Sequence, residues 1–397
     1  MTEWDALQVV GISHRDAGLA VRELFALAPD AIAALLDRER AAGRTAVVLA
    51  TCNRCELYWH GDHDAESWLR DLGAARGRVA GVPLVRRRGA DAMRHLLRVA
   101  SGVESQILGE TEILGQVRRA YDAARAAGTT DLTLDLLFSA ALTAGRRARH
   151  ETLLGRHPLS VSAAAVDLVR GYWDGSLDGR RVVVVGAGEV AEGVLRALDG
   201  SGAAVTVVNR HAERAEALAA AWGGAQVREW SALPSLAAEA DALLVATAAA
   251  APTVTADLLA VASAGRQIRP LRVVDLAVPR NVEPAARGLP GIELSDLDDL
   301  RAQRCPVPSG PPPELPEVEA LLDDELARLL TALRGRAAAP RLAELHRESA
   351  RLTEQELDWA LRRLEHLGDA ERDVVREMAE RLVRRVLYPV SRELRRE

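Results

Sequence analysis

A cysteine at position 52 stands among side chains that could assist a nucleophile. Thr51 and Asn53 offer neutral hydrogen bonds, and Arg54 offers a fixed cation. The apolar segment over residues 45–49 predicts a buried strand, which would place Cys52 in the loop at its end. A thiol is nucleophilic as its thiolate, and a neighbouring guanidinium favours that form or binds a substrate carboxylate. The segment therefore predicts a nucleophilic cysteine, with a buried structural thiol beside a surface arginine as the alternative.

A second polar segment covers residues 94–121. Its apolar residues have helical spacing that Gly102 and Gly109 interrupt, which predicts two helices joined by a turn. His95 could exchange a proton near neutral pH, and a surface histidine on an amphipathic helix is the alternative. The remaining polar side chains are dense enough to line a pocket for an amino acid: Ser105, Glu110, Glu112 and Gln116.

The elements that must position these residues alternate between strand and helix. Strands are expected over 7–12, 45–49 and 56–59, and helices over 29–42, 64–76 and 132–153. This alternation describes a small α/β domain over residues 1–155.

A glycine-rich turn follows four consecutive valines in the segment 180–185. Gly186 allows a tight turn, and Gly188 lets backbone amides approach a pyrophosphate at a helix N-terminus. The last position of the dinucleotide-binding fingerprint accepts glycine or alanine, and this chain has Ala191 there. The segment predicts a cofactor-binding loop made of Gly186, Ala187, Gly188, Glu189, Val190 and Ala191.

The residues after the next strand indicate which nicotinamide cofactor is used. NAD sites place an acid at the end of that strand, but this chain has Asn209 and Arg210 after residues 204–208. An arginine suits a 2′-phosphate, so NADPH is the expected cofactor. Two further strands, over 242–247 and 271–277, complete a nucleotide domain over residues 156–300.

The charge and residue usage exclude several classes of function. The 397 residues carry a net charge of −6, so no overall basic field gathers nucleic acid and DNA binding is not expected. Any tRNA contact would come from local arginines at 86–88 or 146–147, for which a solvated face is the alternative. All 51 basic residues are arginine, which excludes lysine chemistry.

The remaining composition predicts a cytoplasmic protein. Three cysteines provide neither a disulfide framework nor a metal site. The acidic N-terminus is unlike a signal peptide, and no apolar segment is long enough to span a membrane.

The C-terminal part, residues 301–397, begins with a proline-rich segment. Six prolines between positions 305 and 316 predict a linker or elbow. Amphipathic helices are expected over 318–334 and 341–395, and such helices cannot bury their leucines alone. We expect them to pack with a second copy of the chain as a homodimer, with folding back as the alternative.

Together these motifs resemble glutamyl-tRNA reductase, the first enzyme of the five-carbon route to 5-aminolevulinate and tetrapyrroles. The resemblance covers residues 7–300 and is carried by residues 51–54, Glu56, 105–116, 186–191, 209–210 and 275–280. It implies an α/β multidomain protein with an N-terminal α/β catalytic domain, a Rossmann-type doubly wound NADPH domain and a C-terminal all-α dimerisation domain.

The resemblance also implies a mechanism. Cys52 would attack the ester of glutamyl-tRNA to give a thioester, NADPH would reduce it to glutamate-1-semialdehyde, and His95 would assist. Family members are V-shaped homodimers that hand the aldehyde to glutamate-1-semialdehyde aminomutase. The residues expected to bind the glutamyl group are Thr51, Asn53, Arg54, Ser105, Glu110, Thr111, Glu112 and Gln116.

The chain departs from the family pattern at Cys55, at Glu112, at residues 246–250 and in the proline-rich segment. Two alternatives therefore stay open. An NADPH oxidoreductase of the shikimate-dehydrogenase kind would leave Cys52 and residues 95–117 without a purpose. A non-catalytic or secondary-metabolism paralogue would bind glutamyl-tRNA or a pathway partner.

Overall fold

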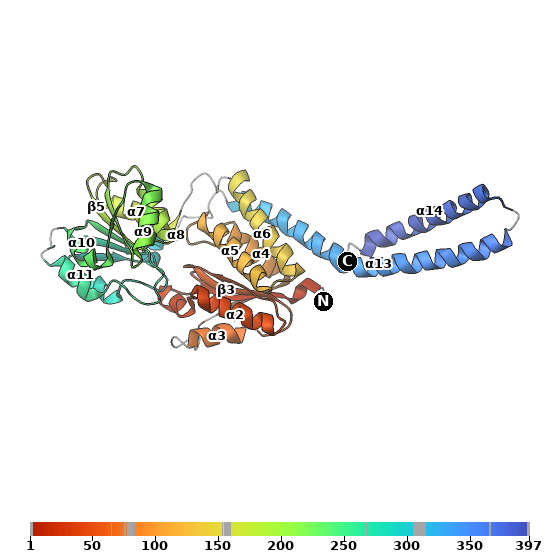
Figure 1. Ribbon diagram of the computed structural model, residues 1–397, viewed down its shortest axis with the longest axis horizontal. Coiled ribbons are helices and arrows are strands. Elements are labelled where there is room, and N and C mark those ends of the chain that lie inside the picture. Colours follow the sequence, from red (N-terminus) through yellow and green to blue (C-terminus); the bar gives the residue numbers. More distant parts are fainter. Residues whose placement is uncertain are drawn as a thin grey trace.

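The chain forms two globular domains and a helical arm that lie in a row (Figure 1). An N-terminal domain (residues 3–152) lies between a parallel-sheet domain (residues 160–304) and the arm. The computed structural model describes residues 3–64, 66–74, 77, 82, 84–152, 154, 160–264, 266, 269–304, 315–364 and 367–394.

The parallel-sheet domain has the doubly wound order predicted for a nucleotide domain. Its six strands lie in the order β10-β9-β8-β5-β6-β7, and all their pairings are parallel. The crevice where the strand order reverses lies between β5 and β8, which is where such sheets bind ligands. The strands are β5 (Arg181–Val185), β6 (Ala204–Val208), β7 (Gln226–Arg228), β8 (Ala242–Val245), β9 (Leu271–Asp275) and β10 (Ile292–Ser295).

Helices cover both faces of this sheet, so its central strands are apolar throughout. In β5, Val182 and Val184 pack into one core cluster while Val183 and Val185 pack into the other. The period of two residues in a strand requires this division, which explains why four consecutive valines are buried. The helices are α7 (Val161–Gly171), α8 (Glu189–Leu198), α9 (Ala212–Trp222), α10 (Leu233–Glu239), α11 (Ala256–Ser263), α12 (Leu297–Arg304) and the 3₁₀ turns η4 (Trp230–Ala232) and η5 (Pro284–Gly288).

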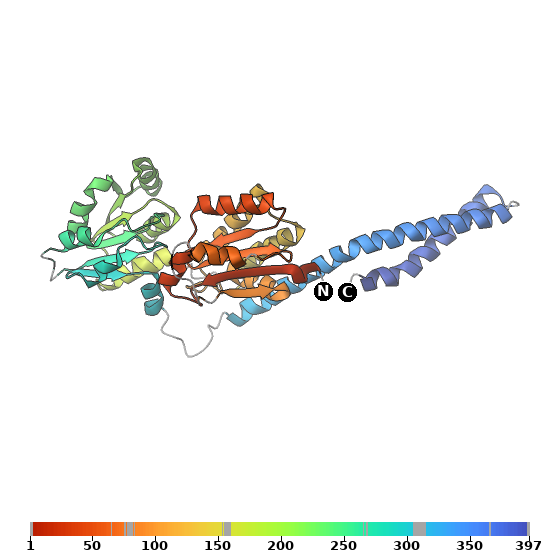
Figure 2. The same cartoon turned by 90° about the horizontal axis from the view of Figure 1, so that it is seen from below.

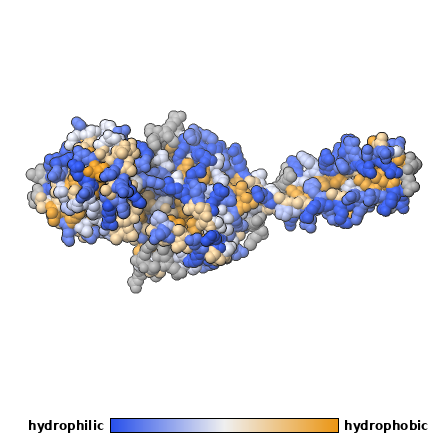
Figure 3. Space-filling view, in the orientation of Figure 1, coloured by the Kyte–Doolittle hydropathy of each residue, from blue (hydrophilic) through white to orange (hydrophobic). Residues whose placement is uncertain are grey.

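The helical arm consists of α13 (Leu315–Arg363) and α14 (Asp369–Leu394). The first half of α13 packs its leucines into the core of the N-terminal domain, and the second half projects away from the body. Helix α14 turns back and lies beside this second half in both views (Figure 2). Apolar side chains remain exposed along the arm (Figure 3). The two arm helices therefore pack side by side within one chain, and their exposed apolar side chains leave a surface on which a second copy could pack.

The predicted helix boundaries in the arm are wrong. Helix α13 continues through Pro340, because long flanking helical segments tolerate the loss of one backbone donor. The helix predicted over 341–395 instead ends at Arg363, and α14 begins after Gly368, whose N–H donates to the Glu371 carboxylate at 2.9 Å. This bond is one half of a capping box, and it satisfies a backbone N–H at the start of the new helix. The predicted elbow lies outside the described residues, except for Pro316 in the first turn of α13.

The N-terminal domain has a four-stranded antiparallel sheet in the order β2-β3-β1-β4. Three strands were predicted, and the edge strand β4 was not, because its three arginines resemble a solvated surface. Edge strands commonly carry such charges. The strands are β1 (Leu7–Ser13), β2 (Val47–Ala50), β3 (Arg54–His60) and β4 (Val85–Arg88). The helices are α1 (Leu19–Arg22), α2 (Pro29–Ala41), α3 (Glu66–Ala74), α4 (Gly89–Ala100), α5 (Glu112–Ala127), α6 (Leu132–Glu151) and the 3₁₀ turns η1 (Glu3–Ala6) and η2 (Glu23–Phe25).

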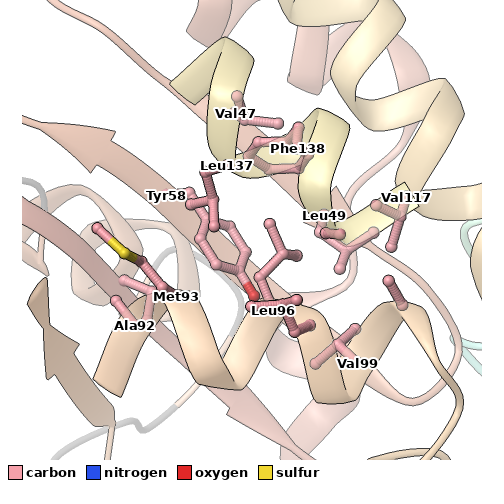
Figure 4. Close-up of a cluster of buried hydrophobic side chains, with 14 of the residues drawn as sticks. Val47, Leu49, Tyr58, Ala92, Met93, Leu96, Val99, Val117, Leu137 and Phe138 are labelled. Atoms are coloured by element: carbon pink, nitrogen blue, oxygen red, sulfur yellow. The ribbon is translucent and has the colours of Figure 1, made fainter. Parts of the chain in front are cut away.

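The core of this domain fixes β3 firmly. Tyr58 points from β3 toward Leu96 of α4 and Phe138 of α6 (Figure 4). Its ring meets Phe138 edge-on at 5.6 Å, and Phe138 stacks on Tyr121 at 5.4 Å between ring centroids. Each fully buried side chain of this size contributes roughly 1.5–3 kcal/mol. The strand that follows Cys52 is therefore a rigid support.

None of the described helices is both long and apolar enough to cross a membrane.

Candidate active site

Cys52 lies in the tight turn between β2 and β3, as predicted from the apolar segment before it. The Thr51 hydroxyl accepts the backbone N–H groups of Asn53 at 3.1 Å and Arg54 at 3.2 Å. The Thr51 N–H in turn donates to the Arg54 carbonyl at 2.8 Å. Thr51 therefore shapes the turn that presents the thiol.

The Cys52 side chain faces the boundary between the two globular domains. It is half-buried, and together with Ile107 it packs against the apolar cluster of the parallel-sheet domain. Burial raises the pKa of the Cys52 thiol above its usual range, and the carboxylates of Glu110 and Glu112 raise it further. The positive charge of Arg22 opposes this rise. In this arrangement the thiol holds its proton until another group removes it.

Arg54, expected to act on the thiol, is engaged elsewhere. Its Nη1 donates to Glu56 Oε1 at 2.8 Å, and its Nη2 donates to the Glu104 carbonyl oxygen. The guanidinium is buried, and its Nε has no hydrogen-bond partner among the residues that the structure describes. That nitrogen is the part of Arg54 still open to a ligand oxygen.

Glu56 is the hub of a buried network that the site prediction missed. Besides Arg54, its carboxylate accepts the Tyr58 hydroxyl at 2.6 Å and contacts His95 Nε2 at 2.9 Å. Burial works against ionisation, but the charges of His95 and Arg54 outweigh it and hold the pKa of Glu56 below its usual range. An ionised carboxylate only accepts, so Nε2 of His95 donates and Nδ1 is left for proton exchange. The sequence signal for this network was one acidic residue, Glu56, in a strand predicted to be apolar.

Glu110 is the most unusual acid near the thiol. It is 2% exposed, and Asn53 Nδ2 donates to its Oε2 at 3.4 Å. Burial and the neighbouring Glu112 carboxylate raise the pKa of Glu110 to about 7, although Ser105, Arg54 and Asn53 act to lower it. The structure therefore brings together Asn53, Ser105 and Glu110, as the sequence predicted.

The other predicted residues of this segment lie toward the second domain. Glu112, at the start of α5, raises the pKa of Cys52 but also lies beside Ser162 and Glu189 of the parallel-sheet domain. Thr111 precedes α5, and its exposed side chain makes no capping hydrogen bond. Gln116 is half-buried one turn after Glu112, on the same side of α5.

The predicted cofactor loop joins β5 to α8 at the crevice in the sheet order. Gly186 has a φ of +124°, and a Cβ there would lie 2.2 Å from the Ala246 carbonyl oxygen, so only glycine fits. A Cβ at Gly188 would meet nothing within 4 Å, so the backbone at the start of α8 is open to a phosphate. This cradle fits the pyrophosphate of a dinucleotide.

The rest of the loop is divided between core and surface. Ala191 is buried and Ala187 is half-buried. Val190 accepts the Ser162 hydroxyl through its carbonyl at 3.1 Å, and the exposed Glu189 forms an ion pair of 2.7 Å with Arg119 of α5. Helix α5 of the N-terminal domain thus contacts the cofactor loop.

The end of β6 carries no acid, in agreement with the sequence prediction of an NADPH site. Asn209 Nδ2 donates to the His211 carbonyl at 3.0 Å, which shapes the turn. The guanidinium of Arg210 is exposed and lies 5.2 Å from the centroid of the Trp230 ring. A cation held over an aromatic ring at this edge could receive a 2′-phosphate.

Polar contacts hold the two domains together around Cys52. Arg280, after β9, donates from its backbone N–H to Glu23 at 2.6 Å and from its guanidinium at 2.8 Å. Gln106 Nε2 donates to the Leu297 carbonyl at 2.8 Å. No sequence motif could have paired these residues, which lie far apart in the chain.

Comparisons with known proteins cover almost the whole chain. Residues 10–152 match the family model described as glutamyl-tRNAGlu reductase, N-terminal domain, and residues 317–397 match the dimerisation domain of the same enzyme. Residues 168–303 match shikimate / quinate 5-dehydrogenase. The predicted three-part fold class is confirmed by these matches.

Several relatives are similar over most of their length. A glutamyl-tRNA reductase 2 of Anaeromyxobacter dehalogenans is 37% identical and spans 99% of this chain and 88% of the relative. A glutamyl-tRNA reductase of Thermus thermophilus is 41% identical, over 81% of this chain and 79% of the relative. The structure of the Methanopyrus kandleri enzyme is 33% identical with a TM-score of 0.47 and covers 99% of this chain and 98% of that one. The chain belongs to the glutamyl-tRNA reductase family.

Proposed function

We propose that this chain reduces glutamyl-tRNA to glutamate-1-semialdehyde, the first step of tetrapyrrole synthesis, through a thioester on Cys52. The observation that carries this proposal is the position of the thiol. Cys52 belongs to the N-terminal domain, but its side chain packs against the domain that carries the dinucleotide fingerprint. An acyl group on this sulfur would therefore face the cofactor.

The reaction proceeds in two steps. Nδ1 of His95 takes the proton of the Cys52 thiol, and the thiolate adds to the ester carbonyl. The bond to the terminal ribose oxygen of the tRNA then breaks to leave a thioester. NADPH, when bound, supplies the hydride that reduces the thioester. The carbon–sulfur bond then breaks, which releases the aldehyde and returns the thiolate. His95, held by Glu56, protonates the departing ribose oxygen from Nδ1.

The polar groups beside the thiol suit the two ends of a glutamyl group. The carboxylates of Glu110 and Glu112 would bind its ammonium group, with Ser105 and Asn53 beside them. The open Nε of Arg54 would receive the side-chain carboxylate. The proposed binding site for the glutamyl group also includes Thr111 and Gln116, and Thr51, which shapes the turn that carries Cys52.

NADPH is the proposed cofactor. Gly186, Ala187, Gly188, Glu189, Val190 and Ala191 would hold its pyrophosphate, and Asn209 and Arg210 its 2′-phosphate. The ion pair between Glu189 and Arg119 joins this loop to the N-terminal domain, which would keep the cofactor close to Cys52.

The arm would make the protein a homodimer. A groove of about 1130 Å³ lies between α13 and α14 and is lined by residues of both helices, including Leu357 and Leu387. Large apolar side chains beside it are exposed, among them Trp359, Leu382 and Tyr388. These surfaces and the match to a dimerisation domain support a second copy as the occupant. Transfer of the aldehyde to the aminomutase stays a prediction.

The test uses purified full-length chain with glutamyl-tRNA. Without NADPH, mass spectrometry should find a glutamyl adduct on Cys52, and NADPH should convert it to semialdehyde. Cys52→Ser should form neither product, whereas Cys55→Ala, which removes the neighbouring buried thiol, should form both. Semialdehyde from the Cys52→Ser variant would refute the proposed nucleophile. Tight tRNA binding with neither adduct nor product would instead establish a binding paralogue.

A further inference from the structure

Arg22, the last residue of α1, is a buried cation that the proposed mechanism does not use. It is only 4% exposed, and Nη2 donates to Asp298 Oδ1 at 2.9 Å. Its other two guanidinium nitrogens, Nε and Nη1, are buried without a hydrogen-bond partner in the part of the chain that the structure describes. Buried donors are almost always paired in folded proteins, so this pair indicates an acceptor that forms during the reaction.

The surroundings of Asp298 relate this acceptor to Cys52. The Cys52 side chain packs against an apolar cluster that contains Leu297 and Leu300, which flank Asp298, the partner of Arg22. Glu110 and Glu112 raise the pKa of the thiol, and Arg22 is the arginine whose charge lowers it. Arg54, the closest arginine in sequence, is committed to Glu56 and to the Glu104 carbonyl. The role that the sequence suggested for Arg54 thus falls to a residue 32 positions earlier.

On the basis of the proposed function, we propose that the unpaired guanidinium N–H groups of Arg22 stabilise the thiolate of Cys52. An arginine stays protonated at every working pH, so it favours the ionised sulfur without taking part in proton transfer. The two carboxylates beside the thiol make such a cation necessary.

Asp298 links this charge to the docking of the second domain. It lies in the first turn of α12, and besides Arg22 it accepts the backbone N–H of Leu19 through Oδ2 at 2.8 Å. Both ends of α1 are thereby held by one carboxylate of the parallel-sheet domain. Arg22 is consequently in place when that domain is docked against Cys52, which is the arrangement that hydride transfer requires.

The experiment measures thiol reactivity alone, without tRNA or NADPH. The full-length chain is treated with iodoacetamide from pH 6 to 10, and alkylation is located to Cys52 by peptide mass spectrometry. Because the buried thiol stays mostly protonated across this pH range, Arg22→Gln should slow alkylation of Cys52 about tenfold at each pH. Arg22→Lys keeps the charge and should recover most of the rate. Arg22→Met is a second charge-removing variant and should behave like Arg22→Gln.

The matched control is Arg280→Gln. It removes a neighbouring contact between the domains, the pair with Glu23, but not one of the charges that act most strongly on Cys52. Its alkylation profile should stay close to that of the unchanged chain. An unchanged profile in folded Arg22→Gln and Arg22→Met, or an equal shift in Arg280→Gln, would overturn the inference. A shift specific to Arg22, in a chain that forms no glutamyl adduct, would sustain this inference and refute the proposed function.

Discussion

Glu110 should make the stability of the N-terminal domain depend on pH near neutrality. Burial and the Glu112 carboxylate raise its pKa from 4.5 to about 7. The folded domain therefore binds a proton more tightly than the unfolded chain does. The stability that this proton contributes is fully present below pH 4.5 and is lost as the pH rises through 7.

The size of the effect follows from the two pKa values. Each tenfold difference in proton affinity corresponds to about 1.4 kcal/mol, so the free energy of unfolding should fall by about 2 to 3 kcal/mol between pH 5 and pH 8 on account of Glu110. Glu110→Gln cannot ionise and should lose this part of the pH dependence. Its stability should exceed that of the unchanged chain most clearly at pH 8.

The assay is urea unfolding at pH 5 and pH 8, followed by hydrogen exchange at peptides from β3, which reports on the N-terminal domain by itself. Glu104→Gln is the matched control, because hydrogen bonding and the charges of Arg98 and Arg15 outweigh burial and lower the pKa of Glu104. The stability that ionised Glu104 contributes is present above pH 4.5 and is lost in acid. The Glu104→Gln variant should therefore keep the original change in the free energy of unfolding between pH 5 and pH 8. If the free energy of unfolding changed equally between pH 5 and pH 8 in Glu110→Gln and in the unchanged chain, the reasoning would be refuted.

Three further predictions concern other parts of the molecule. Glu56→Gln leaves the buried guanidinium of Arg54 without its charge partner and should lower the free energy of unfolding by about 3–5 kcal/mol, measured by urea titration. Gly186→Ala should disrupt the cofactor loop, because its Cβ would lie 2.2 Å from a carbonyl oxygen, whereas Gly188→Ala should fold normally and weaken NADPH binding in a fluorescence titration. Leu382→Glu places a charge on the exposed apolar face of the arm and should convert dimers to monomers in analytical ultracentrifugation.

Features set by local sequence were predicted correctly. The four valines before Gly186 require a strand buried on both faces, and the glycine is required by a close backbone approach. The turn that carries Cys52 depends on the preceding strand and on a threonine that accepts neighbouring amides. In both places the residues that determine the structure lie within a few positions of one another.

Features set by tertiary contacts could not be predicted in this way. Arg54 pairs with Glu56, which lies two residues further along the same strand. Glu56 also contacts His95, and this residue comes from helix α4, so the complete network depends on a tertiary contact. The pair formed by Arg22 and Asp298 joins residues 276 positions apart. In the arm, Pro340 lies within a continuous helix, because segments on both sides of it outweigh one missing hydrogen bond.

The burial of Cys52 both hinders and assists the proposed reaction. A thiol with a raised pKa is a poor nucleophile at rest, but the same exclusion of water would protect the thioester from hydrolysis. Burial is the largest cause of the raised pKa of this thiol, and the carboxylates of Glu110 and Glu112 raise it further. An ammonium group bound by these two carboxylates would cancel their negative charge, while the charge of Arg22 would remain. Binding of the glutamyl group would thus lower the pKa of the thiol that attacks it, so the sulfur becomes more reactive when its substrate is present.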